Sequence, residues 1–184
     1  MRILDVGCGQ DKLPGAIGID RSANTAADVV HDLDRRPWPF ADAEFDHVRC
    51  QDVIEHLDDI VGVMEELHRV ARPGATIHIR VPHFSSVQAY TDPTHRHFFS
   101  TESMGYFTED SRYPHYTDAL FAVRRVRLRL WKPYRWLGLD WLANRFPARY
   151  EKMFAFLFPA ECLEFDLEVR PPIQPSASAA EAVR

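Results

Sequence analysis

The chain has 184 residues, of which 46% are hydrophobic and 27% are charged, and this suits one globular domain with a buried core. A formal net charge of −5 argues against a general nucleic-acid-binding surface, which would carry an excess of Lys and Arg. The three cysteines, Cys8, Cys50 and Cys162, show no CxxC spacing, so we expect reduced thiols and neither a disulfide nor a zinc framework.

The first part of the chain alternates short apolar runs with turns, which is typical of buried parallel strands. These runs cover residues 2–6, 16–20, 28–33, 45–50 and 75–82. Between the last two, residues 58–71 carry apolar side chains at helical spacing, with an aspartate at the start and Arg72-Pro73-Gly74 at the end. The earlier connections are short or broken by proline. The pattern therefore predicts an α/β sheet with one well-marked helix and little helical cover on one face.

Two further β-prone stretches, residues 118–131 and 160–169, predict a terminal antiparallel pair of strands. Between them, residues 134–158 are rich in Trp, Tyr, Phe and Leu with scattered arginines, and they are long enough for two short helices separated at Pro147. The packing of ordinary core helices, an acceptor site, a contact between two subunits and a membrane surface all remain open as roles for this segment.

The chain is therefore expected to form one domain over residues 1–170, with a cofactor-binding half (1–82) and a substrate-side half (83–170). Residues 171–184 are rich in Pro, Ser and Ala and are expected to be a disordered tail. There is neither a secretory signal pattern nor an apolar stretch of membrane-spanning length, which predicts a cytoplasmic protein without a transmembrane segment.

The stretch "LDVGCGQDKLPGAIGID" carries the first candidate site. The turn Gly7-Cys8-Gly9 follows the first strand and allows a ligand to approach the backbone closely, and Asp20 at the tip of the second strand can accept two ribose hydroxyls. A dinucleotide fingerprint would need a third glycine near position 12 and a helix N-terminus for the pyrophosphate, but Lys12 stands there and a helix has no room. A ligand with a ribose and no phosphate fits better.

Four segments in order, "LDVGCG", "GID", "HDLDRRPWPFADAEFDHVRCQDVIEHL" and "ELHRVARPGATIHIRVP", together resemble class I S-adenosylmethionine-dependent methyltransferases of the type 11 group. The resemblance implies a Rossmann-like, mostly parallel sheet and S-adenosyl-L-methionine as cofactor. It places Asp5, Gly7, Cys8 and Gly9 at the methionine end, Asp20 at the ribose, Asp32 and Leu33 at the adenine, and Gln51 and Asp52 where the pocket closes near the methionine moiety.

The chain departs from the family pattern in two ways that bear on the pocket. Asp11 stands where a further glycine is usual, and no full helix precedes the ribose-binding strand. The cofactor pocket is therefore expected to be shallow, with its cover supplied by later residues.

A second candidate site lies in "VPHFSSVQAYTDPTHRHFFSTESMGYF", which follows the fifth strand and leaves the same edge of the sheet. A histidine suits proton removal from a methyl acceptor, and we predict His83 or His95 as general base, with His56 as the third candidate. Packing of these histidines against loop backbone is an equal alternative for each of them. Asp92, His95 and His97 also contain the ligand types of a two-histidine, one-carboxylate metal site, although Arg96 interrupts the pair.

We therefore expect methyl transfer to an oxygen or nitrogen of a small-molecule or glycan acceptor. The chain has no Asn-Pro-Pro-Tyr after the fourth strand and no Pro-Cys nucleophile, which disfavours amino methylation of adenine or glutamine and carbon methylation of cytosine. Two alternatives remain at this stage. One is a non-catalytic nucleoside-binding module, and the other is a metal-dependent enzyme that uses the His/Asp cluster at residues 83–97.

Overall fold

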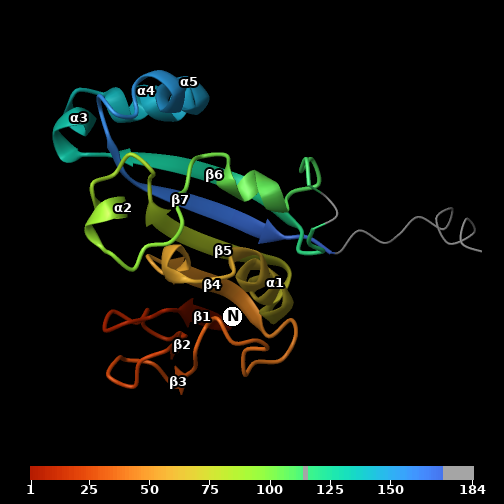
Figure 1. Ribbon diagram of the computed structural model, residues 1–184. Coiled ribbons are helices and arrows are strands. Elements are labelled where there is room, and N and C mark those ends of the chain that lie inside the picture. The colour runs from red at the N-terminus through yellow and green to blue at the C-terminus, as the bar shows by residue number, and fades with distance from the viewer. Residues whose placement is uncertain (114–115, 172–184) are drawn as a thin grey trace, which may run out of the picture.

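A seven-stranded mixed sheet forms the centre of the computed structural model, which describes residues 1–113 and 116–171 (Figure 1). The strand order is β3-β2-β1-β4-β5-β7-β6. The strands are β1 (Ile3–Val6), β2 (Ile17–Asp20), β3 (Val29–Val30), β4 (Phe45–Gln51), β5 (Ala71–Pro82), β6 (Phe121–Leu130) and β7 (Ala160–Val169). From β3 to β5 all neighbours are parallel, and β7 runs antiparallel to both β5 and β6. This confirms the α/β, Rossmann-like fold with a terminal antiparallel pair; from residue 172 on, the expected tail lies outside the described residues.

The strand limits agree with the sequence where alternation or burial is strong and differ where turns intervene. β7 covers the expected residues 160–169, because its inward side chains alternate with polar ones. β5 begins at Ala71, earlier than expected, because Ala71 pairs with Phe45 ahead of a register shift in β4. β3 is reduced to two residues, which leaves the edge of the sheet short.

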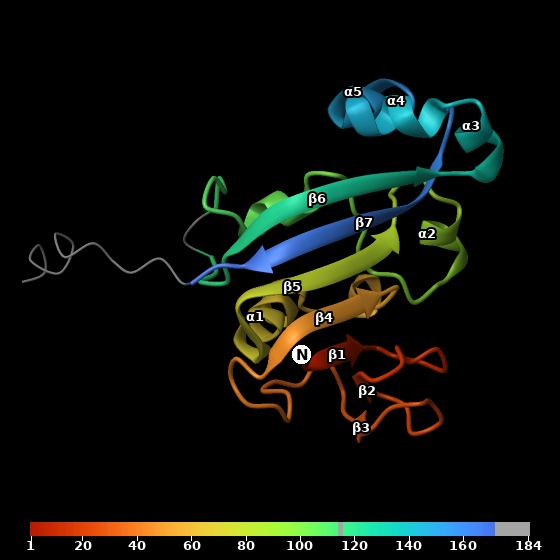
Figure 2. The same ribbon diagram turned by 180° about the vertical axis from the view of Figure 1, so that it is seen from behind.

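One long helix, α1 (Ile60–Val70), lies against β5 (Figure 2). Its N-cap is Asp59, whose carboxylate accepts a hydrogen bond from the backbone N–H of Gly62 at 3.0 Å. The other described helices are short: α2 (Gln88–Thr91), α3 (Lys132–Trp136), α4 (Leu139–Arg145), α5 (Pro147–Met153) and the 3₁₀ turns η1 (Ile54–His56) and η2 (Ser103–Phe107). The predicted scarcity of helices is therefore present in the described residues, and none of their helices is long and apolar enough to cross a membrane.

The aromatic segment forms three helices where two were expected, and they lie together beyond the β6 edge of the sheet (Figure 1). Pro147 opens α5, as predicted, since proline is favoured in the first turn of a helix. The additional break is at Gly138, whose φ of 75° ends α3 before α4 begins.

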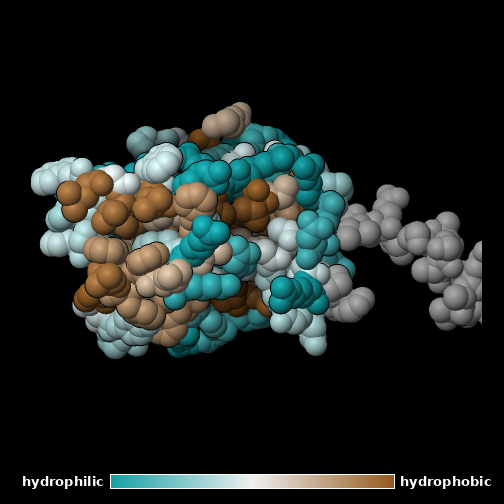
Figure 3. All heavy atoms as spheres, turned by 90° about the horizontal axis from the view of Figure 1, so that it is seen from above, coloured by the Kyte–Doolittle hydropathy of each residue, from teal (hydrophilic) through white to brown (hydrophobic). Residues whose placement is uncertain are grey.

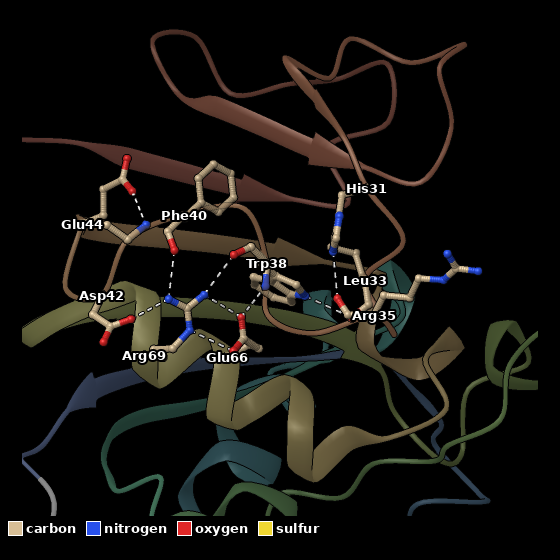
Figure 4. Close-up of polar contacts among 10 residues, drawn as sticks. His31, Leu33, Arg35, Trp38, Phe40, Asp42, Glu44, Glu66 and Arg69 are labelled. Carbon is tan, nitrogen blue, oxygen red and sulfur yellow. Dashed lines mark hydrogen bonds and ion pairs between the residues drawn. The ribbon is translucent and has the colours of Figure 1, made fainter.

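A buried polar network fastens the proline-broken connection after β3 to α1 (Figure 4). Arg69 of α1 forms two hydrogen bonds with the carboxylate of Glu66, at 2.9 and 2.8 Å, and its guanidinium also binds the backbone oxygen of Trp38 at 3.1 Å. Trp38 is 1% exposed, and its indole N–H donates to the backbone oxygen of Leu33 at 3.1 Å. The network therefore holds Leu33 in place at the carboxyl edge of the sheet without a covering helix.

Candidate functional site

The glycine turn after β1 leaves free space beside its backbone. Gly7 and Gly9 have φ values of 61° and 52°, in the left-handed region that favours glycine. A Cβ on Gly7 would come within 2.2 Å of the Val53 side chain, whereas a Cβ on Gly9 would meet nothing within 4 Å. Asp20 accepts hydrogen bonds from the backbone N–H of Gly9 at 3.0 Å and of Ser22 at 2.9 Å. The turn is thus held by the tip of β2 and presents Gly9 to open space.

Asp5 supports this turn from below. Asp5 as a whole residue is 1% exposed. Arg49 donates hydrogen bonds to its carboxylate from Nε at 2.7 Å and from Nη2 at 2.5 Å. The backbone N–H of Leu13 donates to the same carboxylate at 2.8 Å. The predicted cofactor residue Asp5 therefore borders the site while its oxygens tie β1, β4 and the turn together.

Three cavities open at the carboxyl ends of the parallel strands. The glycine-turn cavity, of about 210 Å³, is lined by Asp5, Gly7, Cys8, Gly9, Gln10, Asp11, Arg49, Gln51, Asp52 and Arg80. The strand-tip cavity, of about 290 Å³, is lined by Gly7, Asp20, Arg21, Asp32, Leu33, Asp34, Asp52, Val53, His56, Leu57, Asp92 and Thr94. The histidine cavity, of about 780 Å³, is lined by Asp52, Glu55, His56, Arg80, Pro82, Gln88, Thr91, Asp92, Pro93, His95, Glu161 and Cys162. All the predicted cofactor residues border the first two cavities, so the fold brings them together at one edge.

Asp52 borders all three cavities and is held in an unusual backbone conformation. Its φ of 52° is left-handed, which costs a non-glycine residue roughly 1–2 kcal/mol. The backbone N–H of Asp52 donates to the backbone oxygen of Arg80 at 2.8 Å, and its carboxylate forms an ion pair with the Arg80 guanidinium. Arg80 was not singled out from the sequence; the available signal was a cation between Ile79 and Val81 near the end of β5, directly beside Gln51 of β4.

Two of the three predicted bases lie side by side in the histidine cavity. The rings of His56 and His95 meet edge to face with their centroids 4.5 Å apart. The Thr94 hydroxyl donates its hydrogen to the Asp92 carboxylate at 2.7 Å. Its oxygen, 2.8 Å from the Nδ1 of His56, therefore accepts a hydrogen bond from that nitrogen. The Nδ1 of His95 donates to the backbone oxygen of Ala89 at 3.1 Å. Each histidine therefore keeps its Nε2 lone pair free.

Glu55 completes this cluster, and it was not predicted from the sequence. Its residue is 1% exposed, and neither carboxylate oxygen has a hydrogen-bond partner. Burial raises the pKa of Glu55 to about 7, with the nearby charges of Asp52 and Asp92 acting in the same direction. One potential ligand atom from each of Glu55, His56 and His95 lies within 4.8 Å of the others. The only sequence signal for Glu55 was its place beside His56 in "IEHL".

His83, a predicted general base, lies apart from the other two histidines. It is fully buried and borders none of the three cavities. Its Nδ1 accepts a hydrogen bond from the backbone N–H of Ser85 at 3.1 Å, and its Nε2 lies 3.3 Å from the Glu151 carboxylate of α5. Both ring nitrogens are thus occupied, Nδ1 by Ser85 in the loop after β5 and Nε2 by Glu151 of α5.

The sequence predicts no metal site and offers Asp92, His95 and His97 as an alternative ligand set. The structure groups His95 with Glu55 and His56 instead. The Nε2 of His97 donates to the backbone oxygen of Leu57 at 2.8 Å. Asp92 accepts from the backbone N–H and hydroxyl of Thr94, at 2.8 and 2.7 Å. The Leu57 carbonyl thus binds His97 away from the cluster, and Glu55 and His56 of η1 lie beside His95 instead.

The fold is similar to that of known methyltransferases. Residues 4–79 match the model of a methyltransferase domain family, and no curated protein matches the chain. A SAM-dependent methyltransferase from Archaeoglobus fulgidus superposes with a TM-score of 0.61 at 18% identity, covering 91% of this chain and 85% of that one. An S-adenosylmethionine-dependent methyltransferase from Mesorhizobium loti gives 0.59 at 13% identity, covering 91% and 90%. Phosphoethanolamine N-methyltransferase 2 of Haemonchus contortus, in complex with S-adenosyl-L-methionine, gives 0.58 at 15% identity, covering 93% of this chain and 49% of that one.

Proposed function

We propose that the chain is a class I S-adenosylmethionine-dependent methyltransferase of the type 11 group and that it methylates an oxygen or nitrogen of a small-molecule or glycan acceptor. One observation carries the proposal. The glycine-turn and strand-tip cavities meet the larger histidine cavity at Asp52. A donor in the first two cavities and an acceptor in the third would thus share one wall, as in-line methyl transfer requires.

The residues of the two smaller cavities fit S-adenosyl-L-methionine. Each carboxylate oxygen of Asp20 accepts one backbone hydrogen bond, which leaves lone pairs for the ribose hydroxyls. The open space beside Gly9 admits the amino-acid part of the cofactor, and Asp32 and Leu33 border the place of the adenine. When bound, the cofactor supplies an electrophilic methyl group on a sulfonium sulfur.

We assign the removal of the acceptor proton to His56. Its ring borders both the strand-tip and the histidine cavities, so it reaches the boundary between donor and acceptor. The pKa of His56 is lowered by burial and by the neighbouring His95, which keeps its Nε2 unprotonated at neutral pH. The hydrogen bonds from His56 to Thr94 and from Thr94 to Asp92 orient the His56 ring with its Nε2 free. This Nε2 then takes the proton that the acceptor loses.

The test uses a panel of polyols, sugars, amino sugars and amines, with release of S-adenosylhomocysteine as the readout. For any acceptor that the wild type methylates, His56→Gln should lower kcat by about 10²–10⁴-fold, the usual contribution of a general base. Binding of S-adenosylhomocysteine should stay within about twofold, since the cofactor contacts remain. His97→Gln is the matched control, because His97 binds the Leu57 carbonyl and borders none of the three cavities. Equal kcat values for His56→Gln and His97→Gln would contradict the assignment.

A second candidate function of the same cluster is to bind a divalent cation, and the unpartnered carboxylate of Glu55 favours it. Glu55, His56 and His95 form a two-histidine, one-carboxylate set, and both histidines have their Nδ1–H held by an oxygen, as is usual for metal ligands. Metal analysis of untagged protein decides between the two functions. Stoichiometric metal that is lost in Glu55→Gln and kept in His97→Gln would favour the cation, and metal-free active protein would exclude it.

A further inference from the structure

The helices beyond β6 expose an unusual amount of apolar surface. Ten large hydrophobic side chains between residues 131 and 157 are exposed by 40% or more. They are Trp131, Trp136, Leu137, Trp141, Leu142, Phe146, Met153, Phe154, Phe156 and Leu157, and we call them the aromatic face. Apolar side chains gather over these helices in the space-filling view (Figure 3). A continuous surface of this kind marks an interaction site.

The charge of the same segment is opposite in sign to that of the whole chain. Residues 131–157 hold five cations, all exposed, and two acids, so their formal charge is +3 while the chain carries −5. The five cations are Lys132, Arg135, Arg145, Arg149 and Lys152. Both acids are used internally: Asp140 accepts from the backbone N–H of Leu130 at 2.9 Å, and Glu151 from that of Thr101 at 2.7 Å. The aromatic face is therefore bordered by free positive charge.

A further cavity lies between the proposed acceptor site and this face. It measures about 290 Å³ and is lined by Ser86, Val87, Gln88, Trp131, Tyr134, Pro159, Ala160 and Glu161. Gln88 and Glu161 also line the histidine cavity, so the two cavities are neighbours. The further cavity thus borders the histidine cavity at Gln88 and Glu161 and is also lined by Trp131, the first residue of the aromatic face.

We propose that the aromatic face docks on an anionic lipid membrane and that the methyl acceptor is an amphiphile presented there. Exposed Trp and Phe side chains enter the boundary between headgroups and acyl chains, and the five cations bind acidic headgroups. The polar head of the acceptor would reach the histidine cavity, while its apolar part lies towards Trp131. The second half of the proposal rests on the proposed function, and the docking itself does not.

The charge of the face disfavours a second copy of this chain as the occupant. A two-fold dimer brings the same patch of both subunits together, so the cations that border one face would meet those of the other. An anionic lipid surface instead neutralises each of them. A homodimer through residues 134–158, one of the roles left open by the sequence, is thus the competing outcome of the test.

The experiment is sedimentation of the full chain with phosphatidylcholine vesicles, with and without phosphatidylglycerol, in the absence of methyl donor. We expect binding to the anionic vesicles that weakens with salt, and at least tenfold weaker binding by Trp136→Ser/Trp141→Ser. Arg135→Gln and Arg145→Gln should each weaken binding to anionic vesicles about fivefold. Tyr116→Ser removes an equally exposed aromatic side chain outside the face and should bind like the wild type.

Three outcomes overturn the docking. They are the absence of vesicle binding, unchanged binding by the double tryptophan variant, and a dimer in sedimentation velocity that the double variant abolishes. Parallel titration of the same preparation with S-adenosylhomocysteine separates the two proposals. Cofactor binding without vesicle binding would remove only the docking, whereas vesicle binding without cofactor binding would remove only the methyl transfer. Vesicle binding with methylation of water-soluble acceptors in preference to amphiphilic ones would overturn the amphiphilic acceptor.

Discussion

The two halves of the molecule use their aromatic side chains in opposite ways. In residues 1–82, Trp38 is 1% exposed and joins Leu33 to the network of Arg69 and Glu66. In the later half, Trp136 of α3 is 86% exposed. In the first half, the buried Trp38 helps to hold the sheet edge that carries the predicted cofactor residues. In the second half, many apolar side chains lie on the surface, where a partner can contact them. The contrast teaches that residue type alone does not separate a core from a docking surface.

The largest expected effect on folding is at Trp38, and Trp136 supplies the matched comparison. Trp38→Ala should lower the free energy of unfolding by about 3–5 kcal/mol, because it removes a fully buried ring and one partner of the Leu33 carbonyl. Trp136→Ala should change it by no more than about 0.5 kcal/mol, since its ring is exposed. Urea denaturation of both variants measures the difference, and similar losses would break the comparison between the halves.

A smaller, pH-dependent effect is expected at Glu55, a residue of the first half that lines the histidine cavity. Its pKa is raised from an ordinary value of 4.5 to about 7, so the folded protein holds this proton more tightly than the unfolded chain does. The contribution of the protonated Glu55 to the free energy of unfolding is fully present below pH 4.5 and is lost as the pH rises through 7. Glu55→Gln stays neutral at all pH values.

In metal-free buffer, Glu55→Gln should therefore be more stable than the wild type above pH 7, by on the order of 2 kcal/mol, and the difference should vanish at acid pH. Urea denaturation across this range measures it. Glu102→Gln, at an exposed glutamate, should show no such trend. A constant difference between Glu55→Gln and the wild type at all pH values would contradict the buried, unpartnered carboxylate.

The smallest effects separate backbone strain from ligand contact. Gly9 and Gly74 have φ values of 52° and 82°, and a Cβ on either would meet nothing within 4 Å. Gly9→Ala and Gly74→Ala should each cost about 1–2 kcal/mol of stability through the left-handed backbone. Only Gly9→Ala should also weaken S-adenosylhomocysteine, several-fold, because its methyl group enters the proposed cofactor space. Equal affinities in a calorimetric titration would place the cofactor elsewhere.

Most of the fold could be predicted because its strands carry strong local patterns. The alternation of apolar and polar residues over 160–169 has the same bounds as β7. The apolar spacing of residues 58–71 indicates α1, which begins after its Asp59 cap. The position of the predicted cofactor residues at one sheet edge could be foreseen for a related reason. They directly follow buried strands, and parallel strands bring their carboxyl ends to the same edge. The number of helices in the aromatic segment depended on Gly138, an isolated residue whose conformation the pattern did not reveal.

The acceptor side was less predictable because its contacts are long-range. His83 stands one residue after β5, yet its ring turns to Glu151, 68 positions away, and not to the cavity. His95 and His97 resemble each other in sequence, and only the place of the Leu57 carbonyl removes His97 from the cluster. The sequence did not single out Glu55, which stands beside His56, because burial without a hydrogen-bond partner depends on the fold and not on the sequence pattern.

The central claim is that the edge formed by Gly9 and Asp20 binds the methyl donor, and calorimetric titration with S-adenosylhomocysteine tests it most directly. The wild type should bind, and Asp20→Ala should bind at least about tenfold more weakly, corresponding to 1.4 kcal/mol or more for lost hydrogen bonds to a charged group. Asp42→Ala is the control, because Asp42 binds Arg69 on the exposed surface and lines none of the cavities. No binding by the wild type, or equal binding by Asp20→Ala and Asp42→Ala, would contradict the account.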